Sequence, residues 1–172
     1  NLITRGVNQW WNSGGIWSDI SITNVSGATL AAAAAVWIED SLPLFTNLNI
    51  SKSDNGIIVR HISETTTRPT FLDTKIDDCQ FRGILVERLD HSNFSNLQTN
   101  AIFTGLEVRG TGGPNAKTPG LGIGASFDVN TSGAKVTDAI IEGNAIIGFR
   151  AYTTDSSTSL TNVTIRNNGP ET

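Results

Sequence analysis

Short segments in which apolar and polar residues alternate recur along the whole chain. Six of them open on a large apolar residue, usually followed by Ser or Thr and then by Asp or Asn. These copies lie at residues 17–22, 45–50, 71–76, 94–99, 136–141 and 160–165. Alternation with a period of two residues predicts a β-strand that buries one face.

A second apolar strand pattern follows the Asp or Asn of most copies by nine or ten residues and starts at a glycine. The four glycines are Gly56, Gly83, Gly105 and Gly148. In the first unit, residues 36–38 take this role after a run of alanines at 31–35, which we expect to lead into the strand as a short helical or extended bulge. Each unit is therefore predicted to hold two short strands, with a tight turn at the glycine where φ is positive.

The copies begin at 17, 45, 71, 94, 136 and 160, so their spacings are 28, 26, 23, 42 and 24 residues. A period in the twenties, with strands and no helical pattern, is typical of a solenoid. One unit cannot bury its apolar face alone, so successive coils stack about 4.8 Å apart over a shared core. We therefore expect an all-β solenoid, a parallel β-helix of about six coils.

The Asp or Asn of each copy is predicted to form a turn. Asp and Asn side chains bond to nearby backbone N–H groups, and Asn can also ladder between coils. Asp19, Asp73 and Asp138 are thus interpreted as structural residues, whereas the alternating residues after them, such as Ile20 and Ile22, should point inward.

Residues 160–169, Leu-Thr-Asn-Val-Thr-Ile-Arg-Asn-Asn-Gly, look especially like a coil of a known family. With the repeats, they make the chain resemble the right-handed parallel β-helix of the pectate-lyase-like superfamily over roughly residues 16–168. Right-handedness follows from this resemblance and from the preference of parallel crossovers. The resemblance implies a polysaccharide-binding or polysaccharide-cleaving protein of the phage tailspike and depolymerase type.

The chain departs from the family's catalytic motifs. Residues 36–40 loosely resemble a pectate-lyase strand that ends in an Asp-His pair, but the His is missing. No cluster of Asp residues follows that would match the calcium site of pectate lyases, and the Asn-Thr-Asp and Gly-Asp-Asp motifs of polygalacturonases are also missing. We therefore expect no metal and no other cofactor.

Composition narrows the possible partners. The net charge of -4 argues against nucleic acid, because phosphate binding needs a basic surface. No apolar run is long enough to span a bilayer. Cys79 is the only cysteine, so an internal disulfide and a zinc cluster are both excluded, and we expect it in the core.

We expect residues 1–16 to form an N-terminal cap or linker and residues 17–172 to form the β-helix, with an insertion at 110–122. Trp10 and Trp11 either cover the first coil or stack on a sugar. Residues 121–129 alternate and predict an additional strand. The chain stops after the first strand of its last coil, so we expect a segment of a longer chain, or an end that contacts another subunit.

Outward residues on the strands that follow the glycines form two predicted columns. One holds Glu39, Arg60, Glu87, Arg109 and Tyr152, and the other holds Trp37, Ile58, Leu85, Glu107 and Arg150. Alternating charges neutralise one another as a surface ladder of small net stability. The alternative is a polysaccharide groove, in which Arg60, Arg109, Arg150, Trp37 and Tyr152 bind the substrate.

Two carboxylate pairs are candidates for catalysis. Glu87 and Glu107 are predicted on adjacent coils. Asp77 and Glu142 fall in the other outward column, which is predicted as Thr23, Ser51, Asp77, Asn100, Glu142 and Arg166. If the insertion adds no rung, Asp77 and Glu142 lie roughly 9 to 10 Å apart, near the upper limit for an inverting pair.

Taken together, the sequence favours a phage tailspike-like or tail-fibre-like β-helix that binds a bacterial surface polysaccharide and could depolymerise it. Such a protein would be a homotrimer at the virion surface or outside the cell. One alternative is a secreted monomeric polysaccharide lyase or hydrolase, and another is a shaft or adhesin without catalysis. The resemblance suggests these functions from fold alone, which does not fix function.

Overall fold

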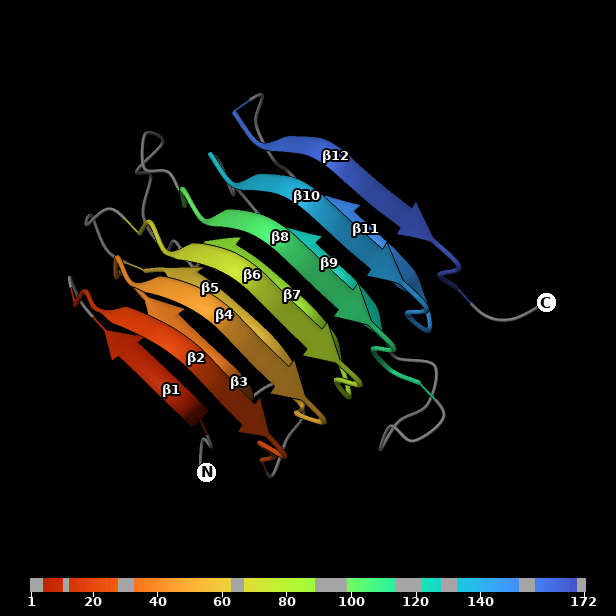
Figure 1. Ribbon diagram of the computed structural model, residues 1–172, viewed down its shortest axis with the longest axis horizontal. Coiled ribbons are helices and arrows are strands. Elements are labelled where there is room, and N and C mark those ends of the chain that lie inside the picture. Colours follow the sequence, from red (N-terminus) through yellow and green to blue (C-terminus); the bar gives the residue numbers. More distant parts are fainter. Residues whose placement is uncertain are drawn as a thin grey trace.

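The computed structural model describes residues 5–10, 13–27, 33–62, 67–88, 99–113, 122–127, 133–151 and 157–169. Within these residues the chain is all-β (Figure 1). Its strands are β1 (Arg5–Trp10), β2 (Ile16–Thr23), β3 (Ala34–Glu39), β4 (Leu44–Ser51), β5 (Asn55–His61), β6 (Thr70–Asp77), β7 (Arg82–Arg88), β8 (Ile102–Arg109), β9 (Ile123–Phe127), β10 (Lys135–Glu142), β11 (Ile147–Ala151) and β12 (Ser159–Arg166). No helix in this described part is long and apolar enough to cross a membrane.

The strands alternate between two parallel sheets of six strands each. The odd-strand sheet has the order β1-β3-β5-β7-β9-β11, and the even-strand sheet has the order β12-β10-β8-β6-β4-β2. Each strand therefore pairs with the strands two places before and after it in the chain (Figure 1). This architecture is compatible with the parallel β-helix that the repeats predict.

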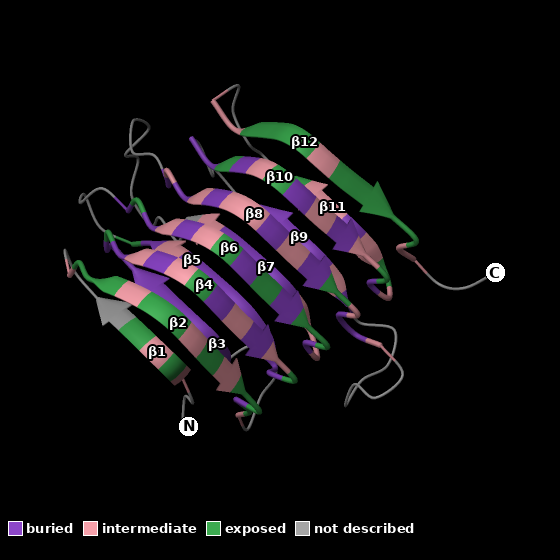
Figure 2. Cartoon of the chain, viewed as in Figure 1, coloured by how far each residue is buried: buried purple, intermediate pink, exposed green. Residues whose placement is uncertain are grey.

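The main core lies between the two sheets and contains residues from both. Its largest side chains form an aromatic ladder along the stack, in which Phe45, Phe71 and Phe103 are fully buried. Ring centroids are 5.2 Å apart between Phe45 and Phe71 and 4.9 Å apart between Phe71 and Phe103. Trp17 and Phe127 continue the ladder at either end. Figure 2 shows that burial falls off toward β12, which is mostly exposed.

A residue in the left-handed region bends every even strand at the same place. The six residues are Asp19, Asn47, Asp73, Gly105, Asp138 and Asn162, with φ between 52° and 67°. The amide of Asn47 donates to Asp19 at 2.8 Å, and that of Asn162 donates to Asp138 at 2.6 Å. The Asp and Asn column thus forms a bend inside each strand instead of the predicted turn, and the predicted Asn ladder between coils is confirmed at Asn47 and Asn162.

The fourth strand of the even-strand sheet corrects one predicted copy. β8 fills the place between β6 and β10, and Phe103 pairs with both Phe71 and Val136. The copy placed at residues 94–99 is therefore wrong as the fourth strand, and its residues 94–98 lie outside the described residues. The copies begin at residues 17, 45, 71, 103, 136 and 160, so the spacings become 28, 26, 32, 33 and 24.

The glycines that open the odd strands are required by close packing, not by positive φ. Gly56, Gly83, Gly124 and Gly148 are aligned across the sheet, and none of them has a positive φ. A Cβ on Gly83 would lie 2.5 Å from the carbonyl oxygen of Gly124, and one on Gly124 would lie 2.6 Å from that of Gly148. The turn with positive φ predicted at Gly56, Gly83 and Gly148 is therefore wrong, whereas the predicted Gly105 has a φ of 67° and lies inside β8.

Four other predicted regions are the N-terminal segment, the alanine run, the strand at 121–129 and the insertion. Residues 5–10 form β1 at the end of the odd-strand sheet, paired with β3, while the proposed division into cap and β-helix stays a prediction. β3 begins within the alanine run, so the extended alternative holds for Ala34 and Ala35. The strand predicted at residues 121–129 exists as β9, and it is the second strand of the fourth unit. Residues 114–121 of the insertion lie outside the described residues.

Cys79 lies in the core, as predicted, with 1% of its surface exposed. Burial raises the pKa of its thiol to about 12. The side chain is therefore a neutral thiol at physiological pH, and it acts as a small apolar residue of the core.

Candidate functional site

The outer face of the odd-strand sheet, where a groove was expected, is buried at the centre of β3, β5 and β7. Trp37, Ile58 and Leu85 point away from the main core, yet each keeps at most 3% of its surface exposed. Together with Ala34 they form a second apolar cluster. Sheets that are covered on both faces read as continuous apolar runs, as β3 and β5 do here.

Trp37 is enclosed by charged side chains. The guanidinium carbon of Arg5 lies 3.9 Å from the centroid of its ring, and that of Arg60 lies 4.3 Å from it. Because β1 and β5 flank β3, the two cations approach the ring from opposite sides. The indole N–H donates to Glu39 at 3.0 Å, and Arg60 also pairs with Glu87. Trp37 thus has no free face for a sugar, and its cluster has a structural role.

The structure regroups the predicted columns of this sheet. Glu39, Arg60 and Glu87 are neighbours, as expected, whereas Arg109 belongs to the even-strand sheet. Tyr152 lies outside the described residues.

In the second column, Ser126 stands where Glu107 was expected, between Leu85 and Arg150. Arg150 donates to the Ser126 hydroxyl at 3.0 Å. Glu87 and Glu107 consequently lie on different sheets, and their proposed pairing on adjacent coils is wrong.

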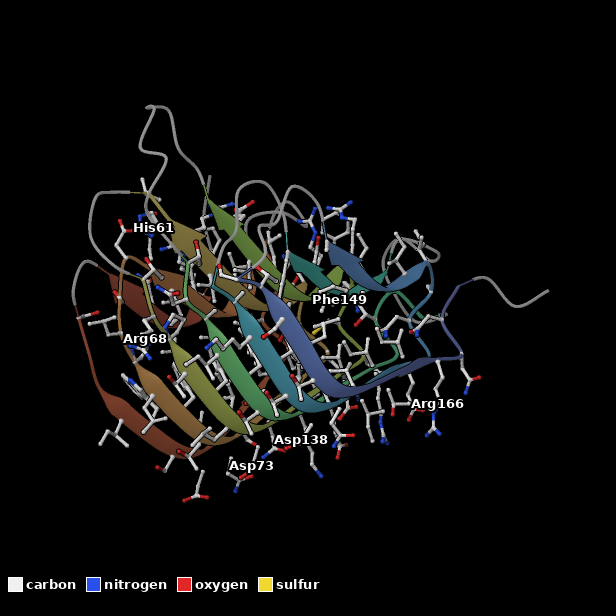
Figure 3. All side chains as sticks on the ribbon, turned by 90° about the horizontal axis from the view of Figure 1, so that it is seen from above. His61, Arg68, Asp73, Asp138, Phe149 and Arg166 are labelled. Atoms are coloured by element: carbon white, nitrogen blue, oxygen red, sulfur yellow. The ribbon has the colours of Figure 1, made fainter. Side chains whose placement is uncertain are left out.

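Four of the predicted residues come together on the outer face of the even-strand sheet. Asp77, Arg109, Glu142 and Arg166 stand next to one another in register on β6, β8, β10 and β12, and we call them the charge row. Arg109 occupies the place predicted for Asn100. Figure 3 shows Asp73, Asp138 and Arg166 along the same outer face of the molecule.

Ion pairs connect most of this row. Arg109 lies 3.1 Å from one oxygen of Glu142 and 3.6 Å from a carboxylate oxygen of Glu107 in the adjacent column. Arg166 binds the other oxygen of Glu142 at 2.6 Å. Both guanidinium groups are therefore neutralised by glutamates, while Asp77 forms no ion pair with another described residue.

The pKa values of the two candidate acids of the charge row are shifted in opposite directions. Partial burial raises the pKa of Asp77, with contributions from Asp78 and Glu107 against the opposing effect of Arg109. The hydrogen bond from Arg166 lowers the pKa of Glu142, and the charge of Arg109 adds to this effect. A general acid and its partner base need shifts of this kind.

The spacing condition for the Asp77 and Glu142 pair is met. One strand, β8, separates β6 from β10, so the two backbones are about 9.6 Å apart at twice the normal strand spacing. The Arg109 side chain, bound to Glu142, lies on the strand between them. An inverting hydrolysis would require a water and a sugar beside this guanidinium.

Uncharged polar residues on β2 and β4 extend this face, and of these only Thr23 and Ser51 were predicted from the sequence to point outward. They alternate with core residues and stand in register as three pairs: Ser18 with Thr46, Ser21 with Asn49, and Thr23 with Ser51. All six are exposed or half-buried. The signal that identifies them is the period-two alternation of each strand, which places their hydroxyl and amide groups on the outward face.

Among the described residues, no three His, Cys, Asp or Glu side chains are grouped so that they could hold a metal ion. Comparison with protein-family models found no match, and comparison with curated proteins found none either.

Proposed function

We propose that the chain is a right-handed parallel β-helix of the pectate-lyase-like kind that binds a polysaccharide on the outer face of its even-strand sheet. The observation that carries the proposal is the contrast between the two sheets. The outer face of β3, β5 and β7 is buried. The outer face of the even-strand sheet, in contrast, is polar and accessible.

Regular spacing makes this face suited to a polymer. Hydroxyl, amide, carboxylate and guanidinium groups recur in columns at the strand spacing of about 4.8 Å. A polymer of sugars that runs across the strands meets a donor or acceptor at every step. Many weak hydrogen bonds then add up over an extended contact, although each contributes only about 1 kcal/mol.

The wider assignment extends the same proposal. A tailspike-like or tail-fibre-like protein attaches a phage to a bacterial surface polysaccharide, acts outside the cell and assembles as a homotrimer. What supports it is the resemblance of the repeats, together with two parallel sheets whose strands alternate along the chain.

Hydrolysis of the bound polymer is the second candidate function. The opposite pKa directions of Asp77 and Glu142 favour it, since Asp77 would protonate the leaving oxygen and Glu142 would activate water. Binding without hydrolysis would make the protein an adhesin.

Purified bacterial surface polysaccharides test both functions. We expect retarded migration in affinity electrophoresis with at least one of them, and release of new reducing ends if the protein is a hydrolase. Asp77→Asn and Glu142→Gln should then each lower the release of reducing ends by at least about 100-fold, the usual effect of losing a general acid or base, while binding persists. Glu87→Gln, the same chemical change on the buried sheet, is the matched control and should leave cleavage unchanged. Failure to bind any polysaccharide would contradict the proposal.

A further inference from the structure

We infer that the sugar-binding part of this face lies over β2 and β4 and takes an uncharged glycan, an inference that rests on the proposed function. The site consists of Ser18, Ser21, Thr23, Thr46, Asn49 and Ser51, which we call the hydroxyl patch. Because these residues lie on two adjacent strands in register, their polar groups form a compact array of two columns.

The hydroxyl patch has unused hydrogen-bonding capacity. Ser18, Ser21 and Thr46 make no side-chain hydrogen bond with any other described residue. Ser51 donates to Thr23 over a long 3.3 Å, and the amide of Asn49 is 3.5 Å from Asn47, at the limit of a hydrogen bond. Each hydroxyl offers one donor and two acceptor positions, which matches the hydroxyl groups of a neutral sugar.

The charges around the patch disfavour an acidic glycan. Arg109 and Arg166 are paired with Glu107 and Glu142, and these carboxylates offset the positive charge that a sugar carboxylate would meet. The even strands carry six acidic side chains on this face against four basic ones, a net charge of -2. They are Asp19, Asp73, Asp77, Glu107, Asp138 and Glu142 against Lys75, Arg109, Lys135 and Arg166. A negative face repels a polyanion.

The six side chains of the hydroxyl patch carry no charge of their own, so they form no ion pair with an amino sugar. Asp19, the charged residue of β2, accepts the amide of Asn47. At the edge of the patch, Leu72 of β6 stands in register with Thr46 and is half-buried on the outer face. An apolar side chain beside hydroxyl groups suits a sugar ring, which has C–H groups on its faces and O–H groups at its rim.

Binding of three polymer classes at two salt concentrations tests the charge assignment. The probes are a panel of neutral glucans, mannans and galactans, polygalacturonate as the acidic polymer, and chitosan as the amino polymer. We expect a neutral polymer to bind best, with a Kd that changes less than about twofold between low and high salt, because no charge pair is screened. Tighter binding of polygalacturonate or chitosan would overturn the inference while leaving the proposed function intact. If no polymer binds, the proposed function fails as well.

Variants of the patch test its position. Replacing Ser21, Asn49 and Ser51 by Ala together should weaken binding of the neutral polymer by roughly tenfold or more, since several hydrogen bonds are lost. The matched control replaces Ser26, Asn100 and Thr158 by Ala, three polar residues outside the even strands, and should change the Kd by less than about twofold. Urea unfolding of both variants checks the fold, and Ser21→Leu, which adds bulk on the surface, provides an independent block. An equal loss in the control, or full binding by Ser21→Leu, would contradict the location.

Discussion

Backbone conformation at single residues shapes each turn of the chain. Beyond the bend inside the even strands, a second column of positive φ follows each of them: Asn24, Lys52, Asp78, Gly110, Gly143 and Asn167. Asn, Asp and Gly adopt the left-handed region at low cost, whereas other residues meet a clash of Cβ. Lys52, with φ of 54°, is the residue of this column that lacks such tolerance.

Lys52→Asn should therefore stabilise the protein by about 0.5–1 kcal/mol, because Asn takes the left-handed conformation more readily. The midpoint of urea unfolding measures the effect. Lys75→Asn, which removes the same charge from an extended position beside Glu107, is the control and should bring no gain. A stability of Lys52→Asn at or below that of the native chain would contradict this explanation.

The charge row makes a residue-scale prediction for pH. A lowered pKa in the folded state means that Glu142 contributes stability above its ordinary pKa of 4.5, and that this contribution is lost as the pH falls through the lowered value. Asp77 acts in the opposite sense. Its pKa is raised in the folded state, so ionisation of Asp77 above its ordinary pKa of 3.8 lowers the free energy of unfolding. Glu142→Gln should thus lower stability at neutral pH, and Asp77→Asn should raise it.

Both differences should disappear in acid, at a pH below the lowered pKa of Glu142 and below the ordinary pKa of Asp77, where the carboxyl groups are protonated in the folded and unfolded chains alike. Urea unfolding at a series of pH values measures them. Effects of the two variants that have the same sign at neutral pH would show that the electrostatic assignment is wrong.

At the scale of the strands, the sequence predicted most elements but misplaced one. Period-two alternation located β2, β4, β6, β10 and β12, because apolar and polar residues alternate along each of them, and β4, β6 and β10 bury the apolar face. The fourth copy was misplaced because its left-handed residue is Gly105, where the other copies have Asp or Asn. Asn96 fits the Asp or Asn pattern but lies too early in the chain. That shift moved Glu107 and Arg109 to the wrong sheet and produced the incorrect pairing of Glu87 with Glu107.

Close approach of the odd strands at their glycines predicts a large effect of one methyl group. A Cβ on Gly83 would meet the Gly124 carbonyl at 2.5 Å and the Val108 side chain closer still. Gly83→Ala should therefore cost roughly 1–3 kcal/mol, as overpacking does in a dense core. Gly14→Ala is the control: its Cβ would have nothing nearer than the Leu42 carbonyl at 3.9 Å, so stability should change by less than about 0.5 kcal/mol. Equal urea midpoints for the two variants would contradict the packing argument.

At the scale of the whole molecule, each strand contacts mainly its neighbours in the stack, so stability should vary along it. β6 and β8 lie in the middle of the even-strand sheet and bury one complete face, whereas nearly all of β12 is exposed. In hydrogen–deuterium exchange, amides of β6 and β8 should exchange more slowly than those of β12 by an order of magnitude or more. Protection of β12 equal to that of β6 would contradict this gradient.

The location of the site could be predicted only in part from the sequence. Alternation shows which residues point outward, and the condition under which Asp77 and Glu142 lie two strands apart, that the insertion adds no strand to their sheet, is met. It cannot show whether an outward face is covered. Trp37 and Arg60 point outward but are covered and paired, so they are not available to bind a sugar. Whether two outward residues are neighbours depends on the lengths of the connections between strands, which a pattern of alternation does not determine.

The central claim is that the even-strand sheet, and not the Trp37 cluster, carries the glycan site. Methyl NMR during titration with a neutral oligosaccharide tests it most directly, using the methyl groups of Thr23, Thr46 and Leu72 and the indole N–H of Trp37 as probes. Progressive shifts of the three methyl signals with an unchanged Trp37 signal are the predicted result. A shift of the Trp37 indole while the three methyl signals stay in place would contradict the claim.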